Sequence, residues 1–191
     1  MELIFIRHGQ GEHTLDLPGS LHVKNPSLTV NGINQAKLLR KKILLTDDDI
    51  IFISPIRRTL ETALIWTKNI DCRKIVSPLI SPRIFPARTN GKTLPCDEII
   101  DLETIKRDYP DLELDKNVSS YLWREGINTM PDSEYNKIAH EFIASLKLLK
   151  RNKIYVVSHD GTITAYRQFI TGCSLSREDF LDETGWFEIT C

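Results

Sequence analysis

The sequence lacks the features that mark several classes of protein. Its 191 residues include only four cysteines, which are widely spaced and form no CxxC pair: Cys72, Cys96, Cys173 and Cys191. This pattern argues against a disulfide scaffold and indicates free thiols in a reducing compartment. No apolar run approaches the roughly 20 residues of a membrane span, and the first run, soon followed by Arg7, is too short for a secretion signal. We therefore expect a soluble, cytoplasmic protein.

Charge of one sign and metal-binding motifs are also missing. The formal net charge is -1, so binding of nucleic acid or membranes through a basic face is not expected. The five histidines form no HxH or HExxH spacing, which argues against a metal site. The absence of a GxSxG motif argues against a serine hydrolase of that type. With 41% hydrophobic and 27% charged residues, the composition fits one globular domain over residues 1–191.

What the sequence does contain is three short apolar runs, each followed by polar residues suited to chemistry. Residues 3–6 lead into Arg7-His8-Gly9, residues 50–53 lead into Ser54-Pro55 and then Arg58, and residues 154–157 lead into Ser158-His159-Asp160-Gly161. If these runs are parallel neighbouring strands, their ends meet in one pocket. Such a pocket would combine imidazoles with guanidiniums, a donor set that suits a phosphoryl group, because arginine binds two phosphate oxygens at once. A neutral imidazole can itself attack phosphorus and form a covalent phosphohistidine.

Four motifs in one order carry a resemblance to a known family: Arg7-His8-Gly9; Pro26-Ser27-Leu28-Thr29 with Gly32 and Gln35-Ala36; Ser54-Pro55 with Arg58 and Thr62-Ala63; and Ser158-His159. Over residues 3 to about 170, the chain resembles the histidine phosphatase superfamily, the phosphoglycerate mutase-like family. The resemblance implies an α/β fold, a three-layer α/β/α sandwich with a mostly parallel central sheet.

The same resemblance implies roles for particular residues. His8 would be the nucleophile, with Arg7, Arg58 and His159 around the phosphoryl group; Arg58 rather than Arg57 falls on the family arginine. Gly9 and Thr14 are expected to bind substrate, although the family often has Asn where this chain has Thr14. A hydroxyl still provides hydrogen-bonding capacity there.

The general acid is the main departure from the family pattern, because no carboxylate stands in Leu79-Ile80-Ser81-Pro82-Arg83, where a Leu-x-Glu segment is usual. A proton donor is still needed to expel an alkoxide from phosphorus. Asp160 is the first candidate, since the acid phosphatase branch uses an Asp after the second histidine. Asp97 and Glu98 are the second candidates. Asp160 has an alternative structural interpretation as the N-cap of a helix, and one residue could serve both purposes.

Apolar residues recur at helical spacing in three places, which predicts three helices. One follows Thr29, one follows Ser54-Pro55 with the proline in its first turn, and one opens at Asp132-Ser133. Alternation of apolar runs with these helices indicates crossover connections between parallel strands. Five prolines interrupt residues 80–131, which we interpret as an inserted, partly helical cap that selects the substrate. Four cations in this cap are either substrate contacts or, more often for such residues, exposed charges: Arg83, Arg88, Lys92 and Arg124.

Taken together, the residues predict a metal-independent phosphomonoester hydrolase that acts on a small phosphorylated substrate and requires no cofactor. Three histidines remain outside this scheme, His13, His22 and His140, and of these His13 could line the pocket because it lies five residues beyond His8. Two alternatives stay open: a phosphoglycerate mutase-type phosphotransferase, and a non-catalytic module that binds phosphate ligands and has lost the general acid. The substrate and the oligomeric state are not predicted.

Overall fold

The centre of the molecule is a six-stranded sheet in the order β4-β3-β2-β5-β1-β6. The computed structural model describes residues 1–88 and 90–191. Its strands are β1 (Glu2–Arg7), β2 (Ile50–Ile53), β3 (Arg73–Val76), β4 (Glu113–Leu114), β5 (Lys153–Ser158) and β6 (Trp186–Thr190). Strand β5 lies between β1 and β2 and runs parallel to both, as predicted for the three apolar runs. Only β6, at one edge, pairs antiparallel among the described strands.

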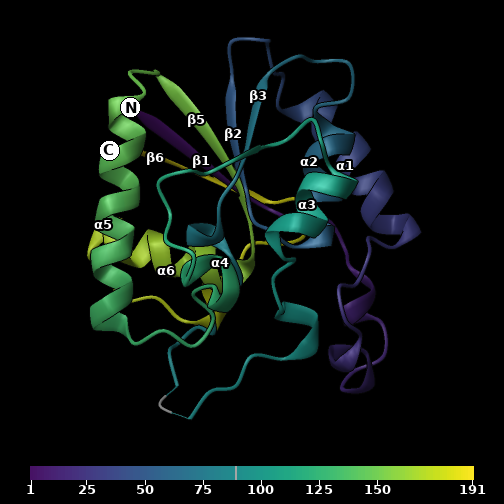
Figure 1. Ribbon diagram of the computed structural model, residues 1–191, viewed down its shortest axis with the longest axis vertical. Coiled ribbons are helices and arrows are strands. Elements are labelled where there is room, and N and C mark those ends of the chain that lie inside the picture. Colours follow the sequence, from purple (N-terminus) through teal and green to yellow (C-terminus); the bar gives the residue numbers. More distant parts are fainter. Residues whose placement is uncertain (89) are drawn as a thin grey trace.

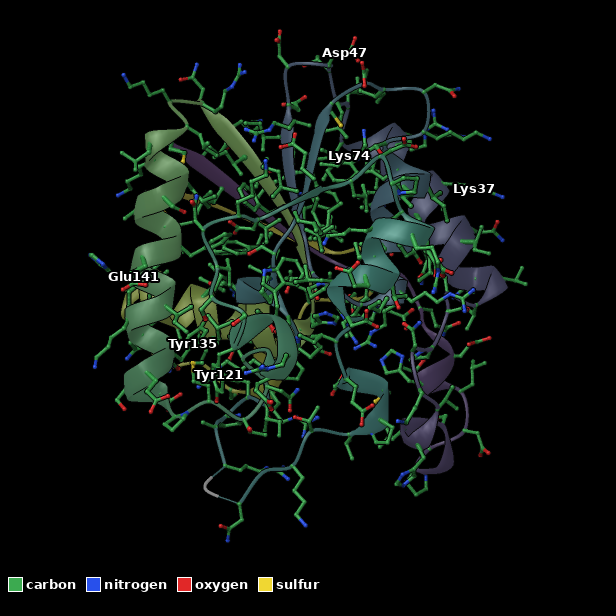
Figure 2. The ribbon with its side chains drawn as sticks, viewed as in Figure 1. Lys37, Asp47, Lys74, Tyr121, Tyr135 and Glu141 are labelled. Atoms are coloured by element: carbon green, nitrogen blue, oxygen red, sulfur yellow. The ribbon has the colours of Figure 1, made fainter. Side chains whose placement is uncertain are left out.

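Helices cover both faces of this sheet (Figure 1). They are α1 (Val30–Lys42), α2 (Arg57–Trp66), α3 (Leu102–Asp108), α4 (Leu122–Glu125), α5 (Asp132–Leu148) and α6 (Asp160–Thr171). Helices α5 and α6 lie on one side of the sheet, and α1, α2 and α3 lie on the other. Lys37 of α1 and Glu141 of α5 point outward from these opposite layers (Figure 2). The predicted three-layer α/β/α architecture is confirmed.

The side chains on the two faces of the sheet pack into two separate hydrophobic cores. Leu3 and Phe5 of β1 pack in the cluster that includes the buried residues of α5 and α6. Ile4 and Ile6, which point to the opposite face because strand side chains alternate, pack in the cluster that includes the buried residues of α1 and α2. Burial on both faces explains why the strands read as continuous apolar runs rather than alternating patterns.

Local sequence signals set the helix starts. The Thr29 side chain accepts a hydrogen bond from the Gly32 amide at 3.0 Å and caps α1, as the sequence predicts. Helix α5 begins at Asp132, also as predicted. The prediction of a first-turn proline in α2 is wrong, because Ile56 is the N-cap and Pro55 precedes it. None of the helices in the described ranges is long and apolar enough to cross a membrane.

Residues 80–131 cross the carboxyl end of the sheet and then return to its edge. They contain the 3-10 turn η4 (Pro95–Asp97), the short helices α3 and α4, and strand β4. Strand β4 pairs parallel with β3, so this segment also supplies an edge strand, which the sequence analysis did not predict. A second loop, with the 3-10 turns η1 (Glu12–Thr14) and η2 (Gly19–His22), lies at the same end of the molecule, and η2 contacts η4 (Figure 1).

Candidate active site

The candidate site lies where β1, β2 and β5 end side by side. His8 follows β1, Ser54 follows β2 and His159 follows β5. Because β5 is hydrogen-bonded to both neighbours, the two histidines reach the same point, with ring centroids 5.1 Å apart. Both side chains are buried. The three strand ends therefore converge on one site, as expected.

The hydrogen bonds of His8 fix which nitrogen is available for chemistry. Its Nδ1 lies 2.7 Å from the carbonyl oxygen of Gly9, which can only accept, so Nδ1 carries the proton. Its Nε2 then has a free lone pair, and this atom accepts a hydrogen bond from Nε of Arg58 at 3.1 Å. Burial, and next the nearby Arg58 charge, lower the pKa of His8 well below its ordinary value. The ring is thus neutral at physiological pH with Nε2 directed at a guanidinium.

Arg58 connects the parts of the site through one buried guanidinium, and its side chain is only 2% exposed. Besides His8, it donates from Nη1 to the Cys96 carbonyl at 2.6 Å and from Nη2 to Asp97 Oδ1 at 2.8 Å. Nη2 also lies 3.2 Å from Nδ1 of His159. The adjacent Arg57 is 45% exposed and pairs with Glu61 on the helix surface. The structure therefore places Arg58, and not Arg57, in the site.

His159 is held in the complementary tautomer. Because Arg58 can only donate, Nδ1 of His159 is the acceptor, and Nε2–H donates to Oγ of Ser54 at 2.8 Å. Burial is the main cause, and the Arg58 charge the second, of a pKa well below the ordinary value for this ring. Ser158 next to it donates to the Ile80 carbonyl at 2.8 Å, the backbone contact that its position at a strand end favours.

The Arg7 guanidinium is held by contacts with two different segments of the chain. Its Nη1 donates to the Leu181 carbonyl at 2.6 Å, and its Nη2 pairs with Asp160 at 2.9 Å. Its Nε is buried without a hydrogen-bond partner among the described residues. The contribution of Leu181 was missed from the sequence, because it is made by a backbone atom in the loop before β6, which no motif marks.

Three carboxylates were considered as general acid, and the structure separates them. Asp160 is the first residue of α6, and the N-cap position belongs to His159, so the prediction of Asp160 as N-cap is wrong. Its Oδ2 bonds Arg7 and its Oδ1 accepts from the Gly161 amide at 2.6 Å. Turn η4 brings Asp97 to Arg58. Glu98 is directed to Lys24 at 3.3 Å, at the surface.

The segment after β3 holds no carboxylate in the site. Ser81 stands there, fully buried, with its Oγ accepting a hydrogen bond from the Ile127 amide at 3.1 Å. Its carbonyl accepts from Thr162 of α6 at 2.7 Å. These contacts make the segment structural, so a carboxylic acid can only reach the site from another element.

Comparison with known proteins agrees with this geometry. Residues 3–83, which include His8 and Arg58, match the family model of the histidine phosphatase superfamily (branch 1). This match shows that the chain is similar to the histidine phosphatase superfamily over that segment.

Similar proteins and solved structures match nearly the whole length of the chain. A Hydrogenobacter thermophilus protein named as a candidate phosphoserine phosphatase is 26% identical over 98% of this chain and 88% of its own. The fold matches the Shigella flexneri alpha-ribazole phosphatase with a TM-score of 0.64 and 21% identity, over 100% and 90% of the two chains. It also matches the phosphoserine phosphatase of Entamoeba histolytica in complex with 3-phosphoglyceric acid, with a TM-score of 0.62 and 22% identity over 98% and 89%.

The remaining predicted site residues of the chain are placed as follows. The Gly9 amide donates to Thr62 at 3.1 Å, and the Thr14 hydroxyl donates to the Gly11 carbonyl at 2.9 Å, so both donors are engaged within the protein. A contact of Gly9 or Thr14 with substrate stays a prediction. His13 does lie beside the site, with its ring centroid 5.6 Å from that of His8.

Arg83 differs from its sequence-based interpretation. The Arg83 side chain was expected to be an exposed charge or a substrate contact, but it is only 1% exposed and pairs with Asp132 at 2.6 Å. It also donates to the carbonyls of Ile127 and Met130, and stacks 4.1 Å from the ring centroid of Tyr135. The other three cations of the segment, Arg88, Lys92 and Arg124, are exposed as expected. Within residues 1–88 and 90–191, no three potential metal ligands of the His, Cys, Asp and Glu types gather.

Proposed function

We propose that this protein is a histidine phosphatase, a phosphomonoester hydrolase that works through a phosphohistidine on His8 and needs no metal ion. The observation that carries the proposal is the state of His8: a neutral ring, protonated on Nδ1, whose Nε2 lone pair faces Arg58 at 3.1 Å. A nucleophile must be unprotonated, and a phosphoryl group needs cationic donors around it, so one contact supplies both requirements.

The first step begins with an exchange of hydrogen bonds. Nε–H of Arg58 donates to Nε2 of His8 in the structure. When the substrate binds, this N–H donates to a phosphoryl oxygen instead, and the lone pair of His8 becomes free. Nε2 then forms a bond to phosphorus as the bond to the leaving oxygen breaks. Arg58 and Arg7 neutralise the equatorial oxygens, and His159 is held beside them by Ser54. In the second step water attacks phosphorus, the N–P bond breaks, and the pair returns to Nε2.

The leaving oxygen must receive a proton, and the geometry favours Asp97 over Asp160 as its source. Both oxygens of Asp160 accept hydrogen bonds within the protein, whereas Oδ2 of Asp97 accepts none from the residues that the structure describes. Asp97 is bonded through Oδ1 to Arg58, the guanidinium that contacts both catalytic histidines. In the second step the same carboxylate would accept the proton of the attacking water.

A small organic phosphomonoester is the substrate class that we propose. The names of similar proteins point to this class: phosphoserine phosphatase, alpha-ribazole phosphatase and glucosyl-3-phosphoglycerate phosphatase. The names of those substrates differ beyond the phosphate, which agrees with a site whose hydrogen-bond donors suit the phosphoryl group. The four free thiols support a cytoplasmic location.

Two substrates test the mechanism, an aryl phosphate, whose leaving group needs little protonation, and an alkyl phosphate. We expect His8→Ala to abolish turnover of both, with His22→Ala as the control, and we expect a chelator to have no effect. Asp97→Asn should lower alkyl turnover by about 10²- to 10⁴-fold and aryl turnover far less. Asp160→Asn should affect both substrates equally, because it releases Arg7.

Mass spectrometry of the alkali-quenched enzyme should find phosphate on His8 during turnover. A selective loss of alkyl turnover in Asp160→Asn would assign the proton donor to Asp160 instead of Asp97. If the parent enzyme hydrolyses neither substrate and forms no adduct, the hydrolase proposal is wrong.

A further inference from the structure

A third imidazole stands at the edge of the site. His13 belongs to η1, and its ring lies 5.6 Å from that of His8, measured between centroids. Gly11 makes room for it: a Cβ added there would lie 2.6 Å from Nδ1 of His13 and 3.2 Å from Cδ of Arg58. The ring of His13 and the stem of Arg58 therefore flank the same glycine, whose φ of -105° any residue can adopt. The glycine is needed here for space and not for its backbone conformation.

The polar atoms beside His8 are incompletely satisfied. Nδ1 of His13 is buried and has no hydrogen-bond partner among the residues that the structure describes, and the same holds for Nε of Arg7. Buried polar atoms in proteins are nearly always paired, so an unpaired one needs an explanation. These two atoms come from different elements, β1 and η1: the His13 ring lies 5.6 Å from that of His8, and Arg7 directly precedes His8 in the chain. An anion with several oxygens, bound at His8, would give both of them a partner.

Burial and nearby positive charges keep the His13 ring unprotonated before such an anion binds. Arg58 of α2 and Arg7 of β1 both act on it. The rings of His8 and His159 are also neighbours, and the carboxylate of Asp97 on η4 is already paired with Arg58. Burial, followed by Arg58 and Arg7, lowers the pKa of His13 to about 3. A dianion bound among these groups reverses the balance, because an opposite charge within a few ångströms favours the protonated ring.

We propose that His13 binds the phosphoryl group of the substrate and takes up one proton from solvent as it does so. The inference rests on the proposed function, since it requires a phosphoryl group at His8. It makes His13 a substrate-binding residue, whose ring is accommodated by Gly11. Uptake of the proton turns a neutral contact into a charge-assisted hydrogen bond, which is about twice as strong.

Calorimetric titration with inorganic phosphate, at a mildly acidic pH that still lies above the pKa of about 3 of the free His13 ring and in two buffers of different ionisation enthalpy, counts the protons taken up. We expect about one proton per phosphate in the parent enzyme and none in His13→Asn, whose affinity should be about 10- to 100-fold weaker, the size of one hydrogen bond to a charged group. In turnover assays, KM should rise more than kcat falls. His22→Asn, an exposed histidine of the same loop, is the matched control and should behave as the parent does.

Gly11→Ala provides the second variant, because it keeps the imidazole but fills the space that the ring occupies. It should lose proton uptake as His13→Asn does, while circular dichroism shows both variants folded. Equal proton uptake and affinity in the parent and in His13→Asn would overturn the inference while leaving the hydrolase proposal intact. A parent that binds no phosphate and hydrolyses no phosphomonoester would overturn both.

Discussion

Replacing Arg58 with lysine keeps the positive charge and removes the shape of the guanidinium. Arg58 donates to His8, to the Cys96 carbonyl and to Asp97, and contacts His159, all within 3.2 Å. A lysine has one ammonium group on a flexible chain and cannot reproduce these directions together. The Arg58→Lys substitution therefore tests geometry separately from charge, at the residue that contacts both the proposed nucleophile and the proposed proton donor.

The magnitude follows from the bonds that the substrate would use. In the proposed reaction the Nε–H of Arg58 turns to a phosphoryl oxygen, and a hydrogen bond to a charged group contributes about 1.5–3 kcal/mol. Its loss raises the barrier by the same amount, which corresponds to roughly a 10- to 10²-fold lower kcat/KM. The buried Cys96 carbonyl also loses its donor, which lowers the free energy of unfolding by about 1–3 kcal/mol.

Hydrolysis of an aryl phosphate by Arg58→Lys and Arg57→Lys provides the assay, with urea denaturation to confirm that both variants fold. Arg57 is the neighbour in sequence, but its exposed i,i+4 pair with Glu61 contributes only about 0.3–0.5 kcal/mol, so its kcat/KM should stay within about twofold of the parent. If Arg58→Lys kept more than about a tenth of the parental kcat/KM, the guanidinium geometry would have no special role and the reasoning would fail.

Two further predictions concern stability. Arg83→Met removes a buried guanidinium that holds two backbone carbonyls, so the free energy of unfolding should fall by about 2–5 kcal/mol and Tm by roughly 4–20 °C; Arg88→Met, at an exposed position, is the control and should differ little. His8 and His159 are buried neutral, with pKa values well below 6.5 in the folded protein, so the unfolded chain binds more protons below that pH. Their contribution to stability is therefore fully present above about pH 6.5 and declines by up to about 1.4 kcal/mol per histidine for each pH unit below it. Denaturation at neutral and mildly acidic pH measures this slope, which should be shallower in His159→Asn; an unchanged slope would contradict the buried neutral ring.

The strand ends could be predicted from sequence because their signal is local. Each run of four apolar residues is long enough to form a doubly buried strand, and the polar motif follows at once, as at His8 and His159. The cap of α1 could be predicted for the same reason, since Thr29 acts on an amide three residues away. Such features need no knowledge of the rest of the chain.

Features that depend on distant partners were not predictable. The placement of Asp97 depends on the course of a proline-rich segment that has no hydrophobic period. The burial of Arg83 requires Tyr135 and Asp132, about fifty residues further along the chain. Strand β6 did leave a signal, a run of aromatic and β-branched residues after Gly185, whereas β4, with two residues, is too short to leave one.

The position of β1 in the sheet sets the order in which the molecule can be made. The strand that leads to the proposed nucleophile leaves the ribosome well before its two neighbours in the sheet, β5 and β6, which lie far along the printed sequence. At about 5–20 residues per second, synthesis of the intervening segment takes roughly 10–30 s. During that time Arg7 and His8 have neither Ser158 nor Leu181 to hold them, so a ribosome-bound fragment that ends before β5 carries the proposed nucleophile but not the assembled site proposed for phosphate.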